Sequence, residues 1–187
     1  MHRIILASQS PRRKQLLEWA EVDFEVMVIP TDESFPPSLS PHEAALHIAR
    51  QKAEAISHLV EGRTVIAADT IVVLANEIIG KPRDREDAIS ILNKLSGNHH
   101  QVITAVVITG QNQTIEFTDT TDVEFHALTE EQVKFYVDKY KPYDKAGAYA
   151  IQEWIGVVGI RCISGDFYNV MGLPVSRVIQ SLNSMNN

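Results

Sequence analysis

Hydrophobic and polar positions change period repeatedly along the chain, and the pattern predicts strands that alternate with helices. The apolar run at 3–7 indicates a short buried strand, and the β-branched stretch at 64–75 indicates a longer strand buried on both faces. Further strands are predicted at 24–29, 77–80, 101–109, 114–126 and 157–164. Helix-start signals and apolar residues at helical spacing predict helices at 11–19, 40–59, 84–95, 129–140 and 173–182.

Helix-start signals support these helices. Ser10 precedes Pro11, and Ser40 and Thr129 each stand three positions before a Glu or Gln, which is the pattern of a capping box. No repeat or linker interrupts the chain, which favours one domain over 1–187. Strands that lead into helices, together with long hairpins, predict an α/β fold with a mixed central sheet flanked by helices.

Composition narrows the function classes. The chain has 24 acidic against 17 basic residues, and this balance argues against binding to nucleic acid polymers or acidic membrane surfaces. The longest apolar run, 102–108, is interrupted by Thr104 and falls short of the roughly 20 residues of a membrane-spanning helix. Cys162 is the only cysteine and is expected to be a small buried residue. Since the sequence shows no signal peptide, we expect a soluble protein in the reducing cytoplasm.

Basic charge gathers at the start of the chain, where the first 14 residues hold four bases and no acid. Ser8, Arg12 and Arg13 stand there at the junction of the first strand and the first helix. Backbone N–H groups and the positive end of the helix dipole meet at such a junction, so these side chains predict a pocket for phosphate oxygens. The alternative is an ordinary N-cap with exposed arginines. No Gly-rich Walker loop occurs, which excludes the commonest nucleotide-binding scheme.

Asp69 stands inside the apolar strand, where an ionised carboxylate is costly unless it is paired or bound to a metal. It is therefore a candidate site residue, and the alternative is a strand-edge aspartate that caps a neighbouring loop. Glu33, in a loop rich in proline, serine and acids, is a further candidate for binding metal or water, or is simply solvated. Lys52 and Lys81 are expected to neutralise phosphate charge beside Asp69 if the fold brings them together, and otherwise to face solvent.

Two polar positions later in the chain have competing interpretations. The amide of Gln152 has one acceptor and two donors, so it can pair with the O4 and N3–H edge of uracil or thymine, or bond within its own loop. His99 and His100 lack the spacing and companions of a zinc site, and we expect polar residues where a strand begins.

A set of short motifs runs in order along almost the whole chain. They are Ser8-Gln9-Ser10-Pro11-Arg12-Arg13, Glu33, Lys52-Ala53, Ala67-Ala68-Asp69-Thr70, Gly80-Lys81-Pro82, Leu95-Ser96-Gly97, Asp144-Lys145-Ala146-Gly147-Ala148-Tyr149, Ile151-Gln152 and Gly165-Asp166 to Gly172-Leu173-Pro174. Each is weak alone, but the ordered set resembles the Maf family of nucleoside triphosphate pyrophosphatases. The resemblance implies an elongated fold of the inosine-triphosphatase type, with two lobes, a nucleotide cleft and a homodimer.

The resemblance also implies roles for single residues. Asp69 matches the catalytic acid of the family, and Arg12, Thr70 and Gln152 match positions that separate its branches. The combination resembles the dTTP/UTP branch rather than the 7-methyl-GTP branch. Residues 153–159 depart from the small, glycine-rich stretch of the family, which puts the shape of the base pocket in doubt more than the chemistry.

The implied reaction is hydrolysis of a nucleoside triphosphate to the monophosphate and pyrophosphate. A divalent cation, Mg²⁺ or Mn²⁺, is expected to bridge phosphate oxygens with help from Glu33, while Asp69 activates water for attack at the α-phosphorus. The other candidates hold the triphosphate, or stabilise charge on the leaving pyrophosphate: Ser8, Arg12 and Arg13 for the first role, and Lys52 and Lys81 for the second.

Two other functions stay open. One is a house-cleaning hydrolase of modified nucleotides, which would use the same residues with dTTP and UTP as stand-ins. The other is a nucleotide-binding regulator of cell division that binds without turnover, and the set of Asp69, Lys52 and Lys81 speaks against it.

Overall fold

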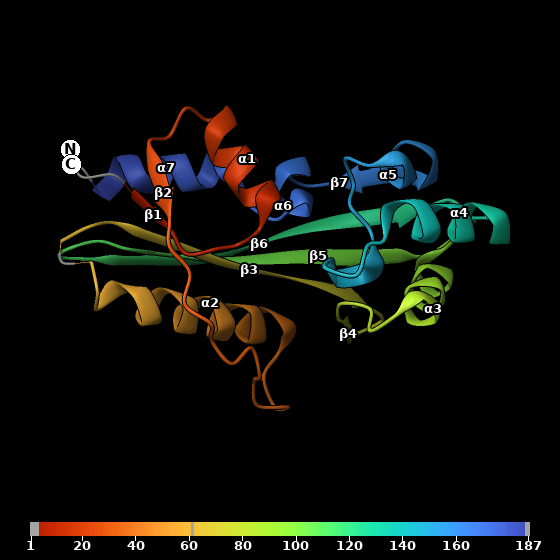
Figure 1. Ribbon diagram of the computed structural model, residues 1–187, viewed down its shortest axis with the longest axis horizontal. Helices are drawn as coiled ribbons and strands as arrows, with labels where there is room; N and C mark the ends of the chain where they lie inside the picture. The colour runs from red at the N-terminus through yellow and green to blue at the C-terminus, as the bar shows by residue number, and fades with distance from the viewer. Residues whose placement is uncertain (1–3, 61, 186–187) are drawn as a thin grey trace. The chain divides into compact units, whose positions relative to one another are not determined.

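The computed structural model describes residues 4–60 and 62–185 and has an α/β fold (Figure 1). The strands are β1 (Ile4–Leu6), β2 (Phe24–Val26), β3 (Val65–Leu74), β4 (Glu77–Ile79), β5 (His99–Thr109), β6 (Thr114–Phe125) and β7 (Ile160–Ser164). The helices are α1 (Pro11–Trp19), α2 (Pro41–Ser57), α3 (Arg85–Leu95), α4 (Glu130–Tyr140), α5 (Trp154–Gly159), α6 (Phe167–Met171) and α7 (Val175–Met185), with a 3-10 turn η1 (Ala146–Ala148).

In these described residues, seven strands form one sheet in the order β2-β1-β3-β5-β6-β7, and β4 pairs with β3. The pairs that β1 makes with β2 and β3 are parallel, whereas β3 with β4 and β6 with β7 are antiparallel. The predicted mixed sheet flanked by helices is therefore confirmed. The contacts divide the chain into two compact units, each built from separate segments.

The first unit comprises the described residues up to 70, residues 104–119 and those from 172 onward. Helix α2 lies along one face of its strands, and α1 and α7 lie along the other face (Figure 1). Because both faces are covered, the strands are apolar almost throughout, and residues 65–68 are at most 1% exposed. Ser10 and Ser40 cap α1 and α2 as predicted, and Glu43 completes the capping box of α2.

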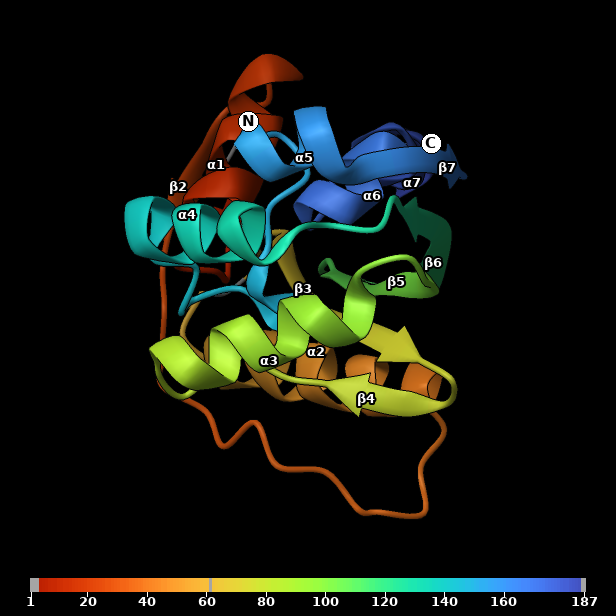
Figure 2. The ribbon, with the colours of Figure 1, turned by 90° about the vertical axis from the view of Figure 1, so that its right-hand side faces the viewer.

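The second unit comprises 71–103 and 120–171. Strand β4 returns on β3 through a turn at Ala75 and Asn76, both with positive φ. Helix α3 packs against α4, whose capping box is formed by Thr129 and Gln132, and α5 leads directly into β7 (Figure 2). No helix of the two described segments is long and apolar enough to cross a membrane.

Three local predictions are wrong. Residues 157–159 complete α5 instead of beginning a strand, because Gly156 and Val157 donate to the Glu153 carbonyl and wind the segment into a helical turn. The strand predicted at 24–29 ends at residue 26. Cys162 is exposed rather than buried, since it lies on β7 at the edge of the sheet. Arg3, where the first strand is predicted to begin, lies outside the described residues.

His100 lies at the start of β5 as predicted, and it is also a core residue of the second unit. Only 2% of it is exposed, its Nε2 lies 2.7 Å from the Tyr149 hydroxyl, and its ring stacks on Phe125 with 5.5 Å between centroids. Burial lowers the pKa of His100 to about 4, with a smaller contribution from the charge of His99. The imidazole is therefore neutral in the folded protein at neutral pH.

Mild acid should destabilise the fold through His100. Its folded pKa of about 4 lies below the 6.5 of an unfolded histidine, so the unfolded chain binds the proton first as pH falls. The neutral ring contributes its full stability above about pH 6.5. The free energy of unfolding falls by about 3 kcal/mol as the pH falls from there to about 4. Urea unfolding across this range measures the loss. His100→Gln should remove this part of the pH dependence, and an unchanged slope in the variant contradicts the assignment.

Candidate active site

Asp69 and Thr70 are neighbours in β3 whose side chains point to opposite faces of the sheet, as side chains alternate along a strand. The Asp69 carboxylate accepts a hydrogen bond from Lys52 on α2, whereas the Thr70 hydroxyl accepts one from Arg13 on α1. These two helices cover opposite faces of the strand (Figure 1). The two residues therefore belong to two polar clusters within the first unit.

Lys52 joins two carboxylates. Its Nζ lies 2.7 Å from Asp69 Oδ1 and 2.7 Å from Glu33 Oε1. The side chains of Lys52 and Asp69 are 16% and 13% exposed, so water screens their attraction weakly, whereas Glu33 is 47% exposed and open to solvent. Each charge of the inner pair offsets the cost of burying the other. The fold thus gathers Glu33, Lys52 and Asp69 from a loop, a helix and a strand.

The same carboxylates fit a divalent cation that is shared with a phosphate ligand. Glu33 and Asp69 converge on the positive charge of Lys52, so this pair of donors already surrounds a cationic group. Mg²⁺ typically takes one or two protein carboxylates, substrate phosphates and several waters, rather than a complete protein cage. Within residues 4–60 and 62–185, no group of three or more His, Cys, Asp or Glu residues is placed to hold a metal alone. Glu33 and Asp69 therefore match the arrangement in which one or two protein carboxylates are completed by substrate phosphates and waters.

Arg13 forms the second cluster. It is 8% exposed, and its Nε donates to the Gly172 carbonyl at 2.7 Å. Nη1 donates to the Ala68 carbonyl at 2.8 Å and to Ser8 Oγ at 3.1 Å, and Nη2 donates to Thr70 Oγ1 at 3.0 Å. One planar guanidinium therefore ties the start of α1 to β3 and to residue 172.

These contacts change the interpretation of Arg13 and Ser8. Burial lowers the pKa of Arg13, and the negative charge of Asp69 partly offsets this effect. Most of the guanidinium N–H groups are engaged by the protein, which favours a positioning role over a direct grip on phosphate. Arg12, half-buried in the first turn of α1, suits the expected contact with phosphate better.

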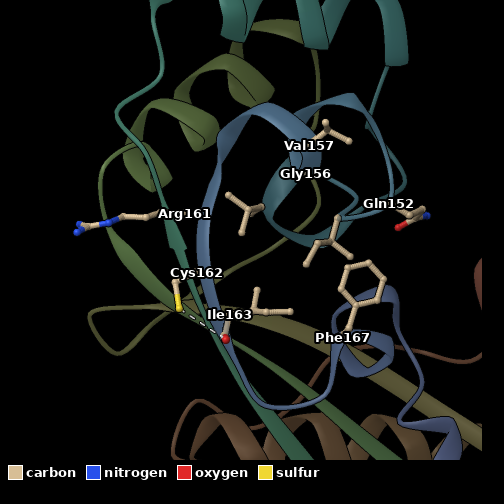
Figure 3. A pocket seen from close by; sticks show the side chains of 9 residues that line it. Gln152, Gly156, Val157, Arg161, Cys162, Ile163 and Phe167 are labelled. Atoms are coloured by element: carbon tan, nitrogen blue, oxygen red, sulfur yellow. Dashed lines mark hydrogen bonds between the residues drawn. The ribbon is translucent and has the colours of Figure 1, made fainter.

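Lys81 and Gln152 belong to the second unit, and both are exposed. Lys81 follows β4, and Gln152 lies in the turn before α5. Gln152 borders an open hollow of about 550 Å³, a size typical of small-molecule sites (Figure 3). The other residues that line it are mostly apolar: Ile151, Gly156, Val157, Ile160, Arg161, Cys162, Ile163 and Phe167.

Sequence reasoning missed two members of the Arg13 cluster. Thr104 is fully buried, and its hydroxyl lies 2.9 Å from that of Thr70. Its place inside the apolar run at 102–108 is a signal that could have identified it. Gly172 contributes only its carbonyl, at a φ of +120° that favours glycine. A pattern of side chains in the sequence does not indicate which backbone carbonyl will accept a hydrogen bond from Arg13.

A model of the Maf-like protein family matches residues 3–185. The chain belongs to the Maf family. Maf relatives named dTTP/UTP pyrophosphatase are similar to it over nearly their whole length. The protein of Bacteroides thetaiotaomicron is 47% identical over 186 residues, covering 98% of this chain and 96% of the relative. That of Parabacteroides distasonis is 49% identical over 183 residues, covering 97% and 95%.

Among solved structures, the Ham1 protein of Staphylococcus aureus resembles this Maf chain in fold. The TM-score is 0.50 with 20% identity, and the match covers 100% of both chains. At this identity the likeness concerns the fold alone, and it agrees with the predicted fold class. The polar clusters around Asp69 and Thr70 are therefore interpreted from their own geometry.

Replacing Arg13 should destabilise this Maf protein. Arg13→Lys keeps the charge but cannot make the forked contacts to Ala68, Thr70 and Gly172, so the free energy of unfolding should fall by about 3 kcal/mol or more. Denaturant unfolding measures the loss. Arg83→Lys is the matched control, since that side chain is 84% exposed and should change stability by less than about 0.5 kcal/mol. Equal stability of the two variants contradicts the positioning role.

Proposed function

We propose that this protein hydrolyses dTTP and UTP to the nucleoside monophosphate and pyrophosphate. The observation that carries the proposal is the meeting of Glu33 and Asp69 at the Lys52 ammonium. A partly buried acid held beside a cation suits the activation of water next to phosphates. Maf relatives that are 43–49% identical over nearly the whole chain bear the name of this activity, which supports the substrate class.

The chemistry assigns one step to Asp69. Its carboxylate accepts a proton from water as the water oxygen attacks the α-phosphorus in line. A new P–O bond forms, the bond from the α-phosphorus to the bridging oxygen breaks, and the pyrophosphate leaves with the electron pair. Lys52 stabilises the negative charge on the departing group, which is also the role that the family resemblance implies for Lys81. Arg12 and the start of α1 hold the triphosphate, while Arg13 and Ser8 keep that helix start in position.

A divalent cation completes the proposed site. When bound, Mg²⁺ or Mn²⁺ would supply positive charge for the phosphate oxygens and would lower the pKa of water. We assign Glu33 and Asp69 as its protein ligands, because both carboxylates already converge on one positive group. Of the two carboxylates, Glu33 is the more exposed to solvent.

Base preference is assigned to Gln152. Its amide can pair with the O4 and N3–H edge of uracil or thymine, beside the mostly apolar hollow that it borders. An amide that turned over would pair with cytosine equally well, so selectivity requires that the side chain keep one orientation.

The family resemblance also supports a cytoplasmic homodimer. We propose both, and light scattering after size-exclusion chromatography tests the dimer, while cell fractionation tests the location.

Asp69→Asn should abolish most of the turnover. The variant keeps the shape of the side chain but loses its charge and most of its basicity, so kcat with dTTP and Mg²⁺ should fall about 10²- to 10⁴-fold. Released pyrophosphate measures the rate. Glu54→Gln, an exposed acid on the same helix as Lys52, should leave it unchanged. Turnover retained by Asp69→Asn contradicts the assignment of the base.

A panel of standard and modified triphosphates, with and without Mg²⁺ or Mn²⁺, tests preference and metal use. We expect dTTP and UTP to be hydrolysed at least about tenfold faster than purine nucleotides, since one missing or misplaced contact has about that effect. A chelator should stop the release of pyrophosphate. Equal rates for purines and pyrimidines contradict the base preference but leave the reaction class intact. Much faster turnover of a modified nucleotide favours the house-cleaning role, and binding without turnover favours the regulator.

A further inference from the structure

Gln152 lies in a tight turn that is fixed from one side. The Glu153 N–H donates to the Ala150 carbonyl at 3.1 Å, which closes a four-residue turn with Ile151 and Gln152 at its corners. Ile151 is buried, whereas Gln152 is exposed beside the hollow (Figure 3). The backbone of the turn therefore decides where the Gln152 side chain starts.

The residue after Gln152 is an acid at an unusual place. Glu153 occupies the N-cap position of α5, yet its side chain makes no capping bond to that helix. Its carboxylate turns instead towards α4, where it accepts a hydrogen bond from the Tyr136 hydroxyl. The Lys145 ammonium lies 3.7 Å from the other carboxylate oxygen. The Glu153 carboxylate therefore stabilises the turn and does not cap α5.

The Tyr136 hydroxyl holds both ends of the turn. It accepts a hydrogen bond from the Ala150 N–H at 3.1 Å and donates one to Glu153. Tyr136 is fully buried, and Lys145 is 9% exposed, so these bonds are made away from bulk water. In such surroundings an unpaired partner is costly, which keeps the three groups together. One phenol oxygen therefore brackets Ile151 and Gln152 on either side.

We propose that Glu153, held by Tyr136 and Lys145, is a positioning residue that fixes the place from which the Gln152 side chain reaches the base and so sets the choice of pyrimidine. The inference rests on the proposed function, because it needs Gln152 to pair with the base. It concerns specificity, since all these groups belong to the second unit, whereas Asp69 and Lys52 belong to the first. A freed turn lets the Gln152 side chain leave the backbone in more than one direction, and its amide then no longer meets the uracil edge in one fixed position.

The test compares kcat and KM for UTP and CTP in Glu153→Ala and Tyr136→Phe. Each change removes the bond between Glu153 and Tyr136, and Tyr136→Phe also frees the Ala150 N–H while it conserves the ring. We expect KM for UTP to rise about tenfold, the preference for UTP over CTP to fall by a similar factor, and kcat to stay within about twofold. Glu153→Gln, whose amide oxygen still accepts from Tyr136, should retain most of the preference.

Two matched controls accompany these variants. Tyr140→Phe makes the same chemical change on the same helix, and Asp144→Asn removes the other ion pair of Lys145 without touching Glu153. Both should keep the wild-type ratio of UTP to CTP.

The outcomes separate the two proposals. If wild type turns over dTTP and UTP, while folded Tyr136→Phe and Glu153→Ala keep the wild-type base ratio, the positioning role is overturned and the proposed function stands. A fall in kcat for all bases with an unchanged ratio also overturns it, because it indicates a general structural role. If wild type shows no turnover of any triphosphate, the proposed function is overturned, and the inference with it. Should Glu153→Ala fail to fold, Tyr136→Phe decides alone.

Discussion

The buried guanidinium of Arg13 sets the geometry around the candidate base. It holds the carbonyl of Ala68 and the hydroxyl of Thr70, the residues immediately before and after Asp69. A rigid planar group that grips both neighbours leaves the backbone at Asp69 little freedom to rotate. The same group holds the Gly172 carbonyl, so the segment that leads into α7 is tied to the strand as well. Because the guanidinium is buried, each lost bond would leave a polar group without a partner, and the arrangement is kept as a whole.

Because side chains alternate along β3, Thr70 and Asp69 lie on opposite faces of the strand, and only the face of Asp69 carries the candidate catalytic groups. Thr70 faces the Arg13 cluster, where every contact is internal, and Asp69 faces Lys52 and Glu33, where one carboxylate remains open to solvent. A charge pair that is half-buried keeps its attraction strong, yet it can still exchange partners when phosphates bring additional negative charge. A fully exposed pair would be screened, and a fully buried one could not reach a ligand. The intermediate burial of Asp69 therefore suits the proposed chemistry.

The sequence predicted α1, α2, α3, α4 and α7, the fold class and the principal strands, because capping residues and apolar spacing are local signals. It did not predict the short helices α5 and α6. It did not predict how Arg13 is used, since an arginine at a helix start reads the same whether it faces phosphate or the core. The burial of His100 and the exposure of Cys162 were not predicted for a similar reason: burial depends on which strands lie alongside, and the neighbouring residues in the sequence do not encode this. Residues 157–159 show tertiary context overriding propensity, since β-branched Val157 and Val158 are wound into α5 by the turn at Glu153. The residues matched to the Maf family were found by the order of motifs, whereas the link between Glu33, Lys52 and Asp69 required the fold.

The support of Gln152 is independent of the support of Asp69. Arg13, Ser8 and Thr104 hold the region of the acid with contacts inside the first unit, and Tyr136, Lys145 and Glu153 hold the turn of Gln152 with contacts inside the second. Two supports that share no residue can change separately, because distant sites without common partners contribute nearly additively. The Glu153 carboxylate is held by Tyr136 and Lys145, which both belong to the second unit. A change at this position can therefore retune base choice while the groups that act on phosphate keep their surroundings.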